Sequence, residues 1–203
     1  MANWVINKVV IKGSEEEIAR CHEQITKGGQ FSLNNIVPMP ESLRVTSGSI
    51  TSIADSWSKA SDKEKKEIED RYNLTDKEKD EIRQIVDNIA KYGYPTWYEW
   101  HVDKWGTKWD VNEPYYEHCG DAISMDFKTA WTTPGAAFLE LSGQYPGLTI
   151  YVEYADEDLG FNCGMYTLCG GEILDEESRD LKFACDMWEY DYEEISREIN
   201  NLA

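Results

Sequence analysis

The apolar positions at the start of the chain predict a strand followed by a helix. Residues 5–12 (VINKVVIK) carry apolar side chains on both faces, which is typical of a strand inside a sheet. Ser14 and Glu17 have the spacing of a capping box, and an apolar stripe at helical intervals runs from Ile18 to Ile25. A strand followed by a helix is the opening half of an α+β sandwich.

The next stretch combines a loop with two helices. Residues 31–53 are predicted to be the loop, because Pro38-Met39-Pro40 is rigid and a tract rich in serine, threonine and glycine follows it. Residues 61–64 (SDKE) and 75–78 (TDKE) are capping boxes that predict the starts of two helices. Both helices mix lysine with glutamate, which is typical of a solvated helical surface.

Tryptophan is concentrated in the middle of the chain. Residues 97–101 (WYEWH) precede residues 105–110 (WGTKWD), and a further tryptophan, Trp131, follows later in the chain. Because tryptophan is usually buried where its N–H finds an acceptor, we expect this stretch to nucleate a core. A short capped helix is predicted to end near Gly106, and residues 108–111 are predicted to form a short strand.

The second half of the chain predicts three strands and two helices. Residues 123–131 alternate apolar and polar positions, as a half-buried strand does. A helix is predicted after Pro134, and residues 148–154 and 161–168 are predicted to pair before Gly170-Gly171. One final helix over residues 178–202 is predicted from an apolar stripe at Leu181, Cys185, Trp188, Tyr192, Ile195, Ile199 and Leu202.

These elements together predict an α+β fold, a ferredoxin-like split βαβ sandwich with additions. We expect residues 1–203 to form a single domain. Its ferredoxin-like core is assigned to residues 1–53 and 96–175, an α-helical insertion to residues 54–95, and an acidic C-terminal helix to residues 176–203.

The charge is unevenly distributed. The chain has a formal net charge of −19 at pH 7, and residues 101–203 hold 22 Asp and Glu against 6 Lys and Arg. Nucleic acid is bound by Lys and Arg, so no direct nucleic-acid binding is expected. The acidic half therefore serves solubility or meets a basic partner. No apolar run approaches the roughly 18 residues of a membrane span, and the start lacks a signal peptide's apolar segment, so we expect a cytoplasmic protein without a membrane partner.

The sequence carries few signs of catalysis. It lacks the phosphate-binding motifs G-x-x-x-x-G-K-[ST] and G-x-G-x-x-G, as well as H-E-x-x-H, C-x-x-C and G-x-S-x-G. Five scattered cysteines do not predict a disulfide framework. We expect no catalytic residue, cofactor or metal. The alternative is a small enzyme with Lys108, Asp110 and His101 in polar roles beside the aromatic segment.

Four motifs stand out along the chain: Asn3-Trp4 with Asn7, Pro38-Met39-Pro40, residues 105–110, and FKTAW at 127–131 followed by Pro134. Together they resemble the YubB-like family of phage- and plasmid-borne proteins. The resemblance spans about residues 1–170 and implies a ferredoxin-like domain and a mobile-element origin, but no reaction. Family members often have a cysteine after the opening tryptophan, where this chain has Val5, so we expect no role for such a thiol here.

We therefore expect a non-enzymatic protein that binds a host protein with a Lys/Arg-lined surface. The specific version is an inhibitor of a nucleic-acid-handling defence complex, such as an anti-CRISPR protein, whose carboxylates replace phosphates. A structural or oligomerisation module is a further alternative, and the oligomeric state is not predicted. The residues expected to contact the partner are Asp156, Glu157, Asp158, Glu172, Asp175, Glu176, Glu177, Glu189, Asp191, Glu193 and Glu194.

Overall fold

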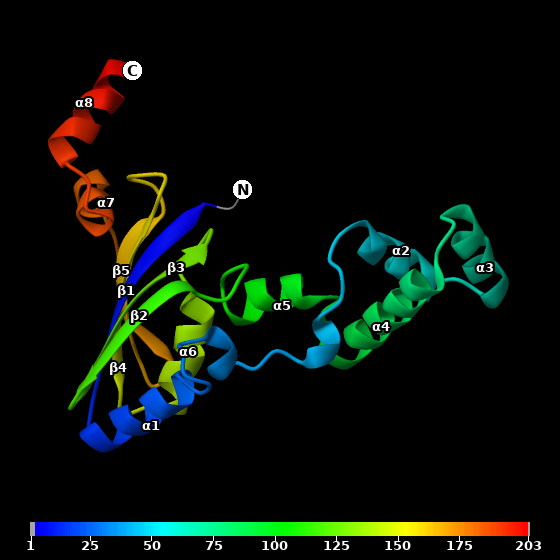
Figure 1. Ribbon diagram of the computed structural model, residues 1–203, viewed down its shortest axis with the longest axis horizontal. Helices are drawn as coiled ribbons and strands as arrows, with labels where there is room; N and C mark the ends of the chain where they lie inside the picture. Colours follow the sequence, from blue (N-terminus) through cyan, green and yellow to red (C-terminus); the bar gives the residue numbers. More distant parts are fainter. Residues whose placement is uncertain (1–2, 203) are drawn as a thin grey trace. The chain divides into compact units, whose positions relative to one another are not determined.

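The computed structural model describes residues 3–202, which form two compact units (Figure 1). The sheet unit consists of residues 3–38 and 104–202, and the helical unit is Met39–Asp103. The helical unit starts before the insertion expected at residues 54–95 and ends after it. The helical unit also includes most of the short aromatic helix, residues 97–104, which was expected to belong to the ferredoxin-like core.

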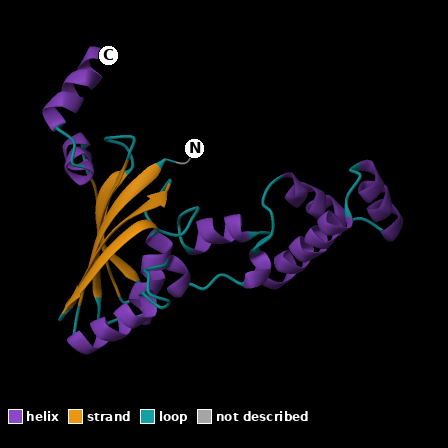
Figure 2. Ribbon diagram, in the orientation of Figure 1, coloured by secondary structure: helices purple, strands orange, loops and turns teal. Residues whose placement is uncertain are grey.

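Six antiparallel strands form the sheet (Figure 2). They are β1 (Trp4–Lys12), β2 (Asn112–Cys119), β3 (Ala122–Ala130), β4 (Thr149–Asp156), β5 (Cys163–Cys169) and β6 (Glu172–Ser178). Their order across the sheet is β2-β3-β1-β4-β5-β6. The first four strands, with α1 (Glu15–Ile25) after β1 and α6 (Gly135–Gln144) after β3, have the connectivity of a ferredoxin-like fold. The predicted α+β, ferredoxin-like fold class is confirmed.

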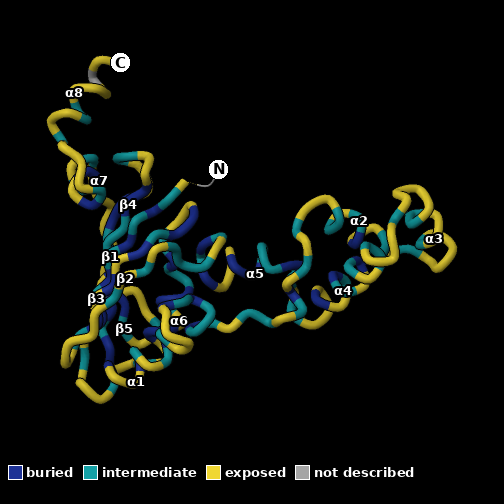
Figure 3. The backbone as a smooth tube through the Cα atoms, viewed as in Figure 1, coloured by how far each residue is buried: buried dark blue, intermediate teal, exposed yellow. Residues whose placement is uncertain are grey.

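The core of the sheet unit lies between one face of the sheet and helices α1 and α6 (Figure 3). Along β1, Val5, Asn7, Val9 and Ile11 are buried on this face, and the alternating residues between them are half-buried. Phe127 of β3 packs edge-on against Phe31, with ring centroids 5.2 Å apart. Burying each apolar side chain of this size contributes roughly 1.5–3 kcal/mol to folding.

A short helix covers one end of the opposite face. Helix α7 (Leu181–Trp188) packs on β4 and β5, where Ala184 and Met187 lie against Ala155 and Cys163. The Nε1 of Trp188 donates to the carbonyl oxygen of Ala155 at 3.1 Å. This contact fixes the C-terminal part of the chain to the sheet.

Strand β2 is absent from the prediction. Pro114 interrupts its pattern, and a register shift lies between Asn112 and Tyr115 in its pairing with β3. Because β2 is an edge strand, the missing N–H of proline breaks no ladder hydrogen bond inside the sheet. A strand at this position lacks the regular alternation from which strands are recognised.

The C-terminal region differs from the single acidic helix expected over residues 176–203. Residues 172–178 form β6, the second edge strand, which pairs with β5. Gly170 and Gly171 join the two strands, and both have the positive φ that two-residue hairpin loops require. Two glycines directly after a predicted strand were therefore the signal for a hairpin.

The predicted helix over residues 178–202 is also broken into two. Helix α7 ends at Trp188, and the next residue, Glu189, caps it in the left-handed conformation (φ 58°, ψ 36°). Asp180 accepts a hydrogen bond from the N–H of Phe183 at the start of α7. Asp191 accepts one from the N–H of Glu194 at the start of α8 (Tyr192–Leu202). The apolar stripe continues through the break, which is why the sequence suggested one helix; the side chain of Leu202 lies outside the described residues.

The helical unit contains α2 (Ser49–Ser58), α3 (Asp62–Arg71) and α4 (Asp76–Tyr92), with α5 (Trp97–Lys104) running to its end. Both capping boxes predicted for α3 and α4 are confirmed. Helix α2 is a correction, because residues 49–53 were expected in a loop. Serine and threonine have low helix propensity, but Ile50, Ile53 and Trp57 pack on Ile82 and Ile85 of α4. Tertiary packing overrides propensity here.

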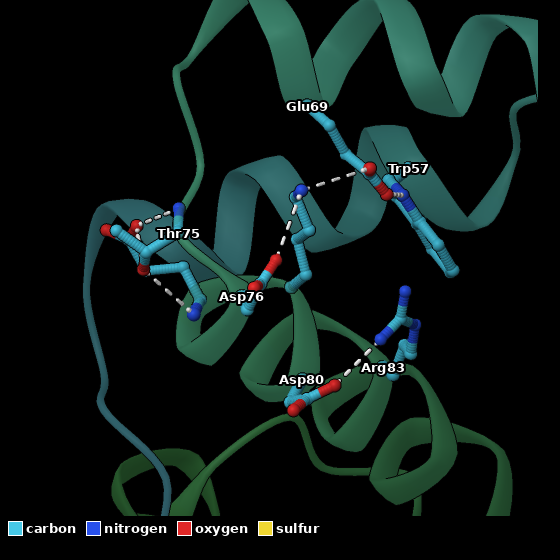
Figure 4. A network of polar contacts seen from close by, with 8 residues as sticks. Trp57, Glu69, Thr75, Asp76, Asp80 and Arg83 are labelled. Atoms are coloured by element: carbon cyan, nitrogen blue, oxygen red, sulfur yellow. Dashed lines mark hydrogen bonds and ion pairs between the residues drawn. The ribbon is translucent and has the colours of Figure 1, made fainter.

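Polar contacts join the three helices to one another (Figure 4). Trp57 of α2 donates its Nε1–H to Glu69 of α3 at 3.2 Å. Lys79 of α4 pairs with the same Glu69 at 3.8 Å and with Asp76 at 3.5 Å. Lys65 adds a cation–π contact, with its Nζ 4.4 Å from the ring centroid of Trp57. Charged side chains therefore link helices α2, α3 and α4 to one another.

A separate finding concerns membranes. Among the helices of the described part of the chain, none combines the length and the apolar character that crossing a membrane requires.

Candidate functional site

The segment 105–110 is a loop, which corrects the short strand predicted at residues 108–111. Its polar groups anchor it to the sheet unit. Trp105 is buried and donates its Nε1–H to the carbonyl oxygen of Val37 at 2.9 Å. Thr107 donates its hydroxyl to the carbonyl oxygen of Ala130 at 2.8 Å. The predicted burial of Trp105 in a core is confirmed.

Asp110 has a structural role in this loop. Its carboxylate accepts hydrogen bonds from the hydroxyl of Ser32 at 2.5 Å, from the N–H of Leu33 at 2.8 Å and from the N–H of Val111 at 2.8 Å. His101 belongs to the helical unit, whereas Lys108 and Asp110 belong to the sheet unit. Because the carboxylate of Asp110 already accepts three hydrogen bonds, the geometry gives no support to its use as a catalytic base.

Lys108 lies between two partly exposed indoles. Its Nζ is 4.7 Å from the ring centroid of Trp109 and 4.5 Å from that of Trp131. Trp4 extends the group, because its ring centroid lies 6.0 Å from that of Trp109. We call Trp4, Lys108, Trp109 and Trp131 the aromatic cluster. A cation over an indole face is attracted by the negative potential of the ring.

Trp131 holds a backbone conformation that bulky residues rarely adopt. Its φ is +75°, in the left-handed region. Its N–H donates to the carbonyl oxygen of Asn3 at 2.9 Å, and its carbonyl accepts from the Nδ2 of Asn162 at 2.9 Å. Hydrogen bonds on both sides therefore hold the strained residue in place, and residues held in this way are concentrated at binding and switch sites.

The end of β4 and the turn after it contain three of the predicted contact residues, and they differ in role. Asp156 is buried, and its carboxylate accepts from the N–H of Asp158 at 2.9 Å and from the Nδ2 of Asn162 at 3.0 Å. It therefore organises the turn and is not a surface residue, which corrects its predicted position. Glu157 and Asp158 are exposed, as is Phe161, whose exposed fraction is 70%.

The acidic residues of β6 are divided between the two faces of the sheet. Asp175 pairs in register with Thr167 and Glu177 with Met165, which places both on the face opposite α1 and α6. Glu176 pairs with Tyr166 and lies on the helix-covered face. The acidic helix expected over residues 176–203 therefore begins instead as part of a strand with carboxylates on both faces.

The acidic residues from β6 to α8 are all exposed to solvent. We call residues 172–198 the C-terminal acidic segment. It has three basic residues, Arg179, Lys182 and Arg197, and eleven acidic residues, all of them exposed (Figure 3). Across the described residues, a single ion pair involves these carboxylates, between Glu177 and Arg179 at 3.1 Å. The eleven are Glu172, Asp175, Glu176, Glu177, Asp180, Asp186, Glu189, Asp191, Glu193, Glu194 and Glu198.

Other reactive side chains do not converge on a site. The five cysteines are free thiols, and burial raises the pKa of the Cys21 thiol to about 12, so it carries no nucleophilic thiolate near neutral pH. His22 stacks on His118 with ring centroids 4.8 Å apart. Burial, and then the neighbouring His118, lower the pKa of His22. In the part of the chain that the structure covers, no group of three His, Cys, Asp or Glu side chains could hold a metal ion.

Sequence reasoning missed two groups of residues. The exposed Trp109, Trp131 and Phe161 were assigned to a core or a strand, although Trp131 follows the last alternating position of β3 and could have been recognised as a strand end. Tyr154 and Tyr166 lie on the helix-covered face of β4 and β5, with ring centroids 6.0 Å apart. Tyr154 pairs with Gly164 and Tyr166 with Val152, so the two rings are diagonal neighbours, which the alternation within each strand does not show.

Comparisons with known proteins describe the fold. Residues 104–199 match the family described as a ferredoxin-like domain in Api92-like protein. The fold is similar to the crystal structure of a protein Api92 from Yersinia pseudotuberculosis, with a TM-score of 0.52 and 12% sequence identity over 88% of this chain and 98% of that chain. No curated protein matches the chain. Neither match names the YubB-like family or a phage or plasmid origin, and together they establish a ferredoxin-like domain similar to that of Api92-like proteins.

Proposed function

We propose that the protein is a binding protein whose C-terminal acidic segment docks onto a Lys/Arg-lined surface of another protein. One observation carries this proposal: eleven exposed carboxylates in residues 172–198 have a single ion pair among the described residues. Neighbouring like charges repel one another and lower the stability of the free protein. A basic surface would relieve that repulsion and would also accelerate encounter by electrostatic attraction.

The aromatic cluster supplies the apolar part of the proposed interface. Trp109 and Trp131 are exposed by 38% and 37%, and tryptophan is enriched among residues that dominate binding energy. The turn after β4 contacts both regions, because Asn162 bonds to Trp131 and the carbonyl of Asp156 accepts from Trp188 of α7. The N–H of Glu157 on this turn donates to the carbonyl oxygen of Trp4 at 2.9 Å, so this exposed acidic residue is the backbone neighbour of the aromatic cluster. Indole faces and carboxylates both favour Arg and Lys on the partner.

The finer version of the proposal concerns the identity of the partner. A basic groove that ordinarily holds nucleic acid would accept carboxylates at the positions of phosphates. We infer that such a groove, in a host complex that handles nucleic acid in defence, is the target of the acidic segment. The support is the charge of the segment together with the motifs that resemble phage- and plasmid-borne proteins.

The test is affinity capture from nuclease-treated host lysate at low and at high salt. The variant replaces Asp175, Glu189 and Glu198 with lysine, and the matched control replaces Glu23, Asp121 and Glu140, exposed acidic residues of the sheet unit outside the segment. We expect a stoichiometric basic protein to bind the wild type and the control. We expect the variant to lose it, and high salt to release it.

Three outcomes would contradict the proposal. Equal capture by the variant and the control at low salt would remove the acidic segment from the interface. Self-association of the wild type that is insensitive to charge reversal would favour an oligomerisation module. No stoichiometric partner at either salt concentration would argue against a binding function. Single-stranded DNA added as a competitor tests the finer version, because it should displace the protein only from a groove that holds nucleic acid.

A further inference from the structure

A pocket of about 280 Å³ lies on the helix-covered face, where α6 meets β4, β5 and β6. Leu139, Leu168 and Ile173 supply most of its apolar wall, and Thr133, Tyr154, Tyr166 and Glu176 supply its polar groups. All of these residues belong to the sheet unit. A largely apolar hollow with a few convergent polar groups is the usual form of a small-molecule site.

Small residues keep the pocket open. Gly135 and Ala136 present little side chain at the start of α6, and a Cβ at Gly135 would lie 3.7 Å from the hydroxyl of Tyr166. Gly164 makes room for the ring of Tyr154, since a Cβ there would come within 3.0 Å of the Tyr154 hydroxyl. The hollow therefore depends on the particular residues that surround it, and larger side chains would fill it.

The polar groups of the pocket differ in their hydrogen bonding and in their charge. The hydroxyls of Thr133 and Tyr166 share a hydrogen bond of 3.0 Å. Burial, and to a smaller extent Glu176, raise the pKa of Tyr154, and burial also raises the pKa of Tyr166. Both phenols are therefore neutral at physiological pH. Glu176 is the one charged side chain among the pocket's lining residues.

We propose that this pocket binds a small organic cation, an amine or guanidine carried on an apolar body. The carboxylate of Glu176 would pair with the cationic group, and the apolar wall would cover the body. The rings of Tyr154 and Tyr166, 6.0 Å apart, offer faces for a cation–π contact. An anion is disfavoured, because no Lys or Arg lines the pocket and the net charge is −19.

This site shares one carboxylate, Glu176, with the C-terminal acidic segment, but it lies on the other face of β6 from Asp175 and Glu177. Glu176 is directed to the helix-covered face, whereas its neighbours Asp175 and Glu177 lie on the opposite face. The strand therefore provides its own matched control. Glu176→Gln removes the charge in the pocket with almost no change in shape, and Glu177→Gln makes the same chemical change one residue along on the other face.

The experiment is calorimetric titration of the full chain with 2-phenylethylamine, with 2-phenylethanol as the neutral probe of similar shape. We expect 2-phenylethylamine to bind with a Kd of about 1 mM or tighter, and 2-phenylethanol to bind at least about tenfold more weakly. Glu176→Gln should weaken binding of the amine by about tenfold, while Glu177→Gln should leave it within about twofold. Ala136→Leu should abolish binding of both probes by filling the pocket.

Several results would overturn the inference. They are no heat of binding with 2-phenylethylamine at millimolar concentration, equal affinity for amine and alcohol, or equal losses in Glu176→Gln and Glu177→Gln. Retained binding in Ala136→Leu, with the circular dichroism spectrum unchanged, would place the ligand elsewhere. The titration includes no second protein. A negative result would therefore not count against the proposed binding of a partner by the acidic segment.

Discussion

The helical unit and the C-terminal acidic segment use charge in opposite ways. Met39–Asp103 has 14 acidic and 10 basic residues, and its ion pairs recur at helical spacing, as between Asp80 and Arg83 at 2.7 Å. Residues 172–198 have 11 acidic and 3 basic residues. In the first region the charges cap helices and connect them. In the second, Asp180 and Asp191 cap α7 and α8, and the other carboxylates contribute little to folding. Charge that does not serve the fold is available for a partner.

The largest expected effect concerns an acidic residue that does serve the fold of the sheet unit. Asp156→Ala should lower the free energy of unfolding by about 2 kcal/mol, because the N–H of Asp158 and the Nδ2 of Asn162 lose their charged acceptor. Urea unfolding followed by tryptophan fluorescence measures the change. Asp158→Ala, at an exposed carboxylate, is the control and should stay within about 0.5 kcal/mol. Equal losses in the two variants would mean that burial does not separate Asp156 from the surface acids.

A smaller effect is expected at a helix start in the helical unit. Thr75→Ala should cost about 1 kcal/mol, because the N–H of Glu78 loses the hydroxyl that caps α4. Thr75→Ser retains that hydroxyl and should preserve stability. Thermal unfolding by circular dichroism compares the two. A Thr75→Ser variant as unstable as Thr75→Ala would show that the methyl group, and not the capping hydrogen bond, accounts for the loss.

The smallest effect tests the comparison directly. Neutralising Glu172, Asp175 and Glu189 should raise the free energy of unfolding by about 0.5 kcal/mol at low salt, because like-charge repulsion is relieved. Neutralising Asp62, Asp76 and Asp80 of the helical unit should lower it by about the same amount, because ion pairs and first-turn carboxylates are lost. Both differences should shrink in high salt. Changes of the same sign would end the distinction between the two regions.

The sequence predicted the elements whose local signals agree with the fold. Strand β1, helix α1 and the capping boxes of α3 and α4 combine correct periodicity with correct end signals. The edge strands β2 and β6 were missed, because an edge needs no continuous apolar pattern and tolerates Pro114 and four consecutive polar residues. Helix α2 was missed because its stability comes from packing on α4 and not from its serine-rich sequence.

The candidate site was less accessible to sequence reasoning. The acidic composition of the C-terminal half was visible, but its distribution over two sheet faces depends on the hairpin register between β5 and β6. The burial of Asp156 depends on the turn that Asn162 closes. The position of Lys108 between Trp109 and Trp131 requires a loop and a strand end distant in sequence to meet. Tertiary structure decides each of these points.

The exposed edge of β6 has a consequence for assembly. An edge strand presents unpaired backbone groups to which a second sheet can add, and the two-glycine hairpin holds this strand at the limit of the sheet. Asp175, Glu176 and Glu177 cover that edge with charge, so two copies that approach edge to edge repel each other. The carboxylates that we propose attract a basic partner therefore also act as a barrier to polymerisation through the sheet. Replacing these three carboxylates with the corresponding amides, which removes the barrier, should therefore favour intermolecular β-structure.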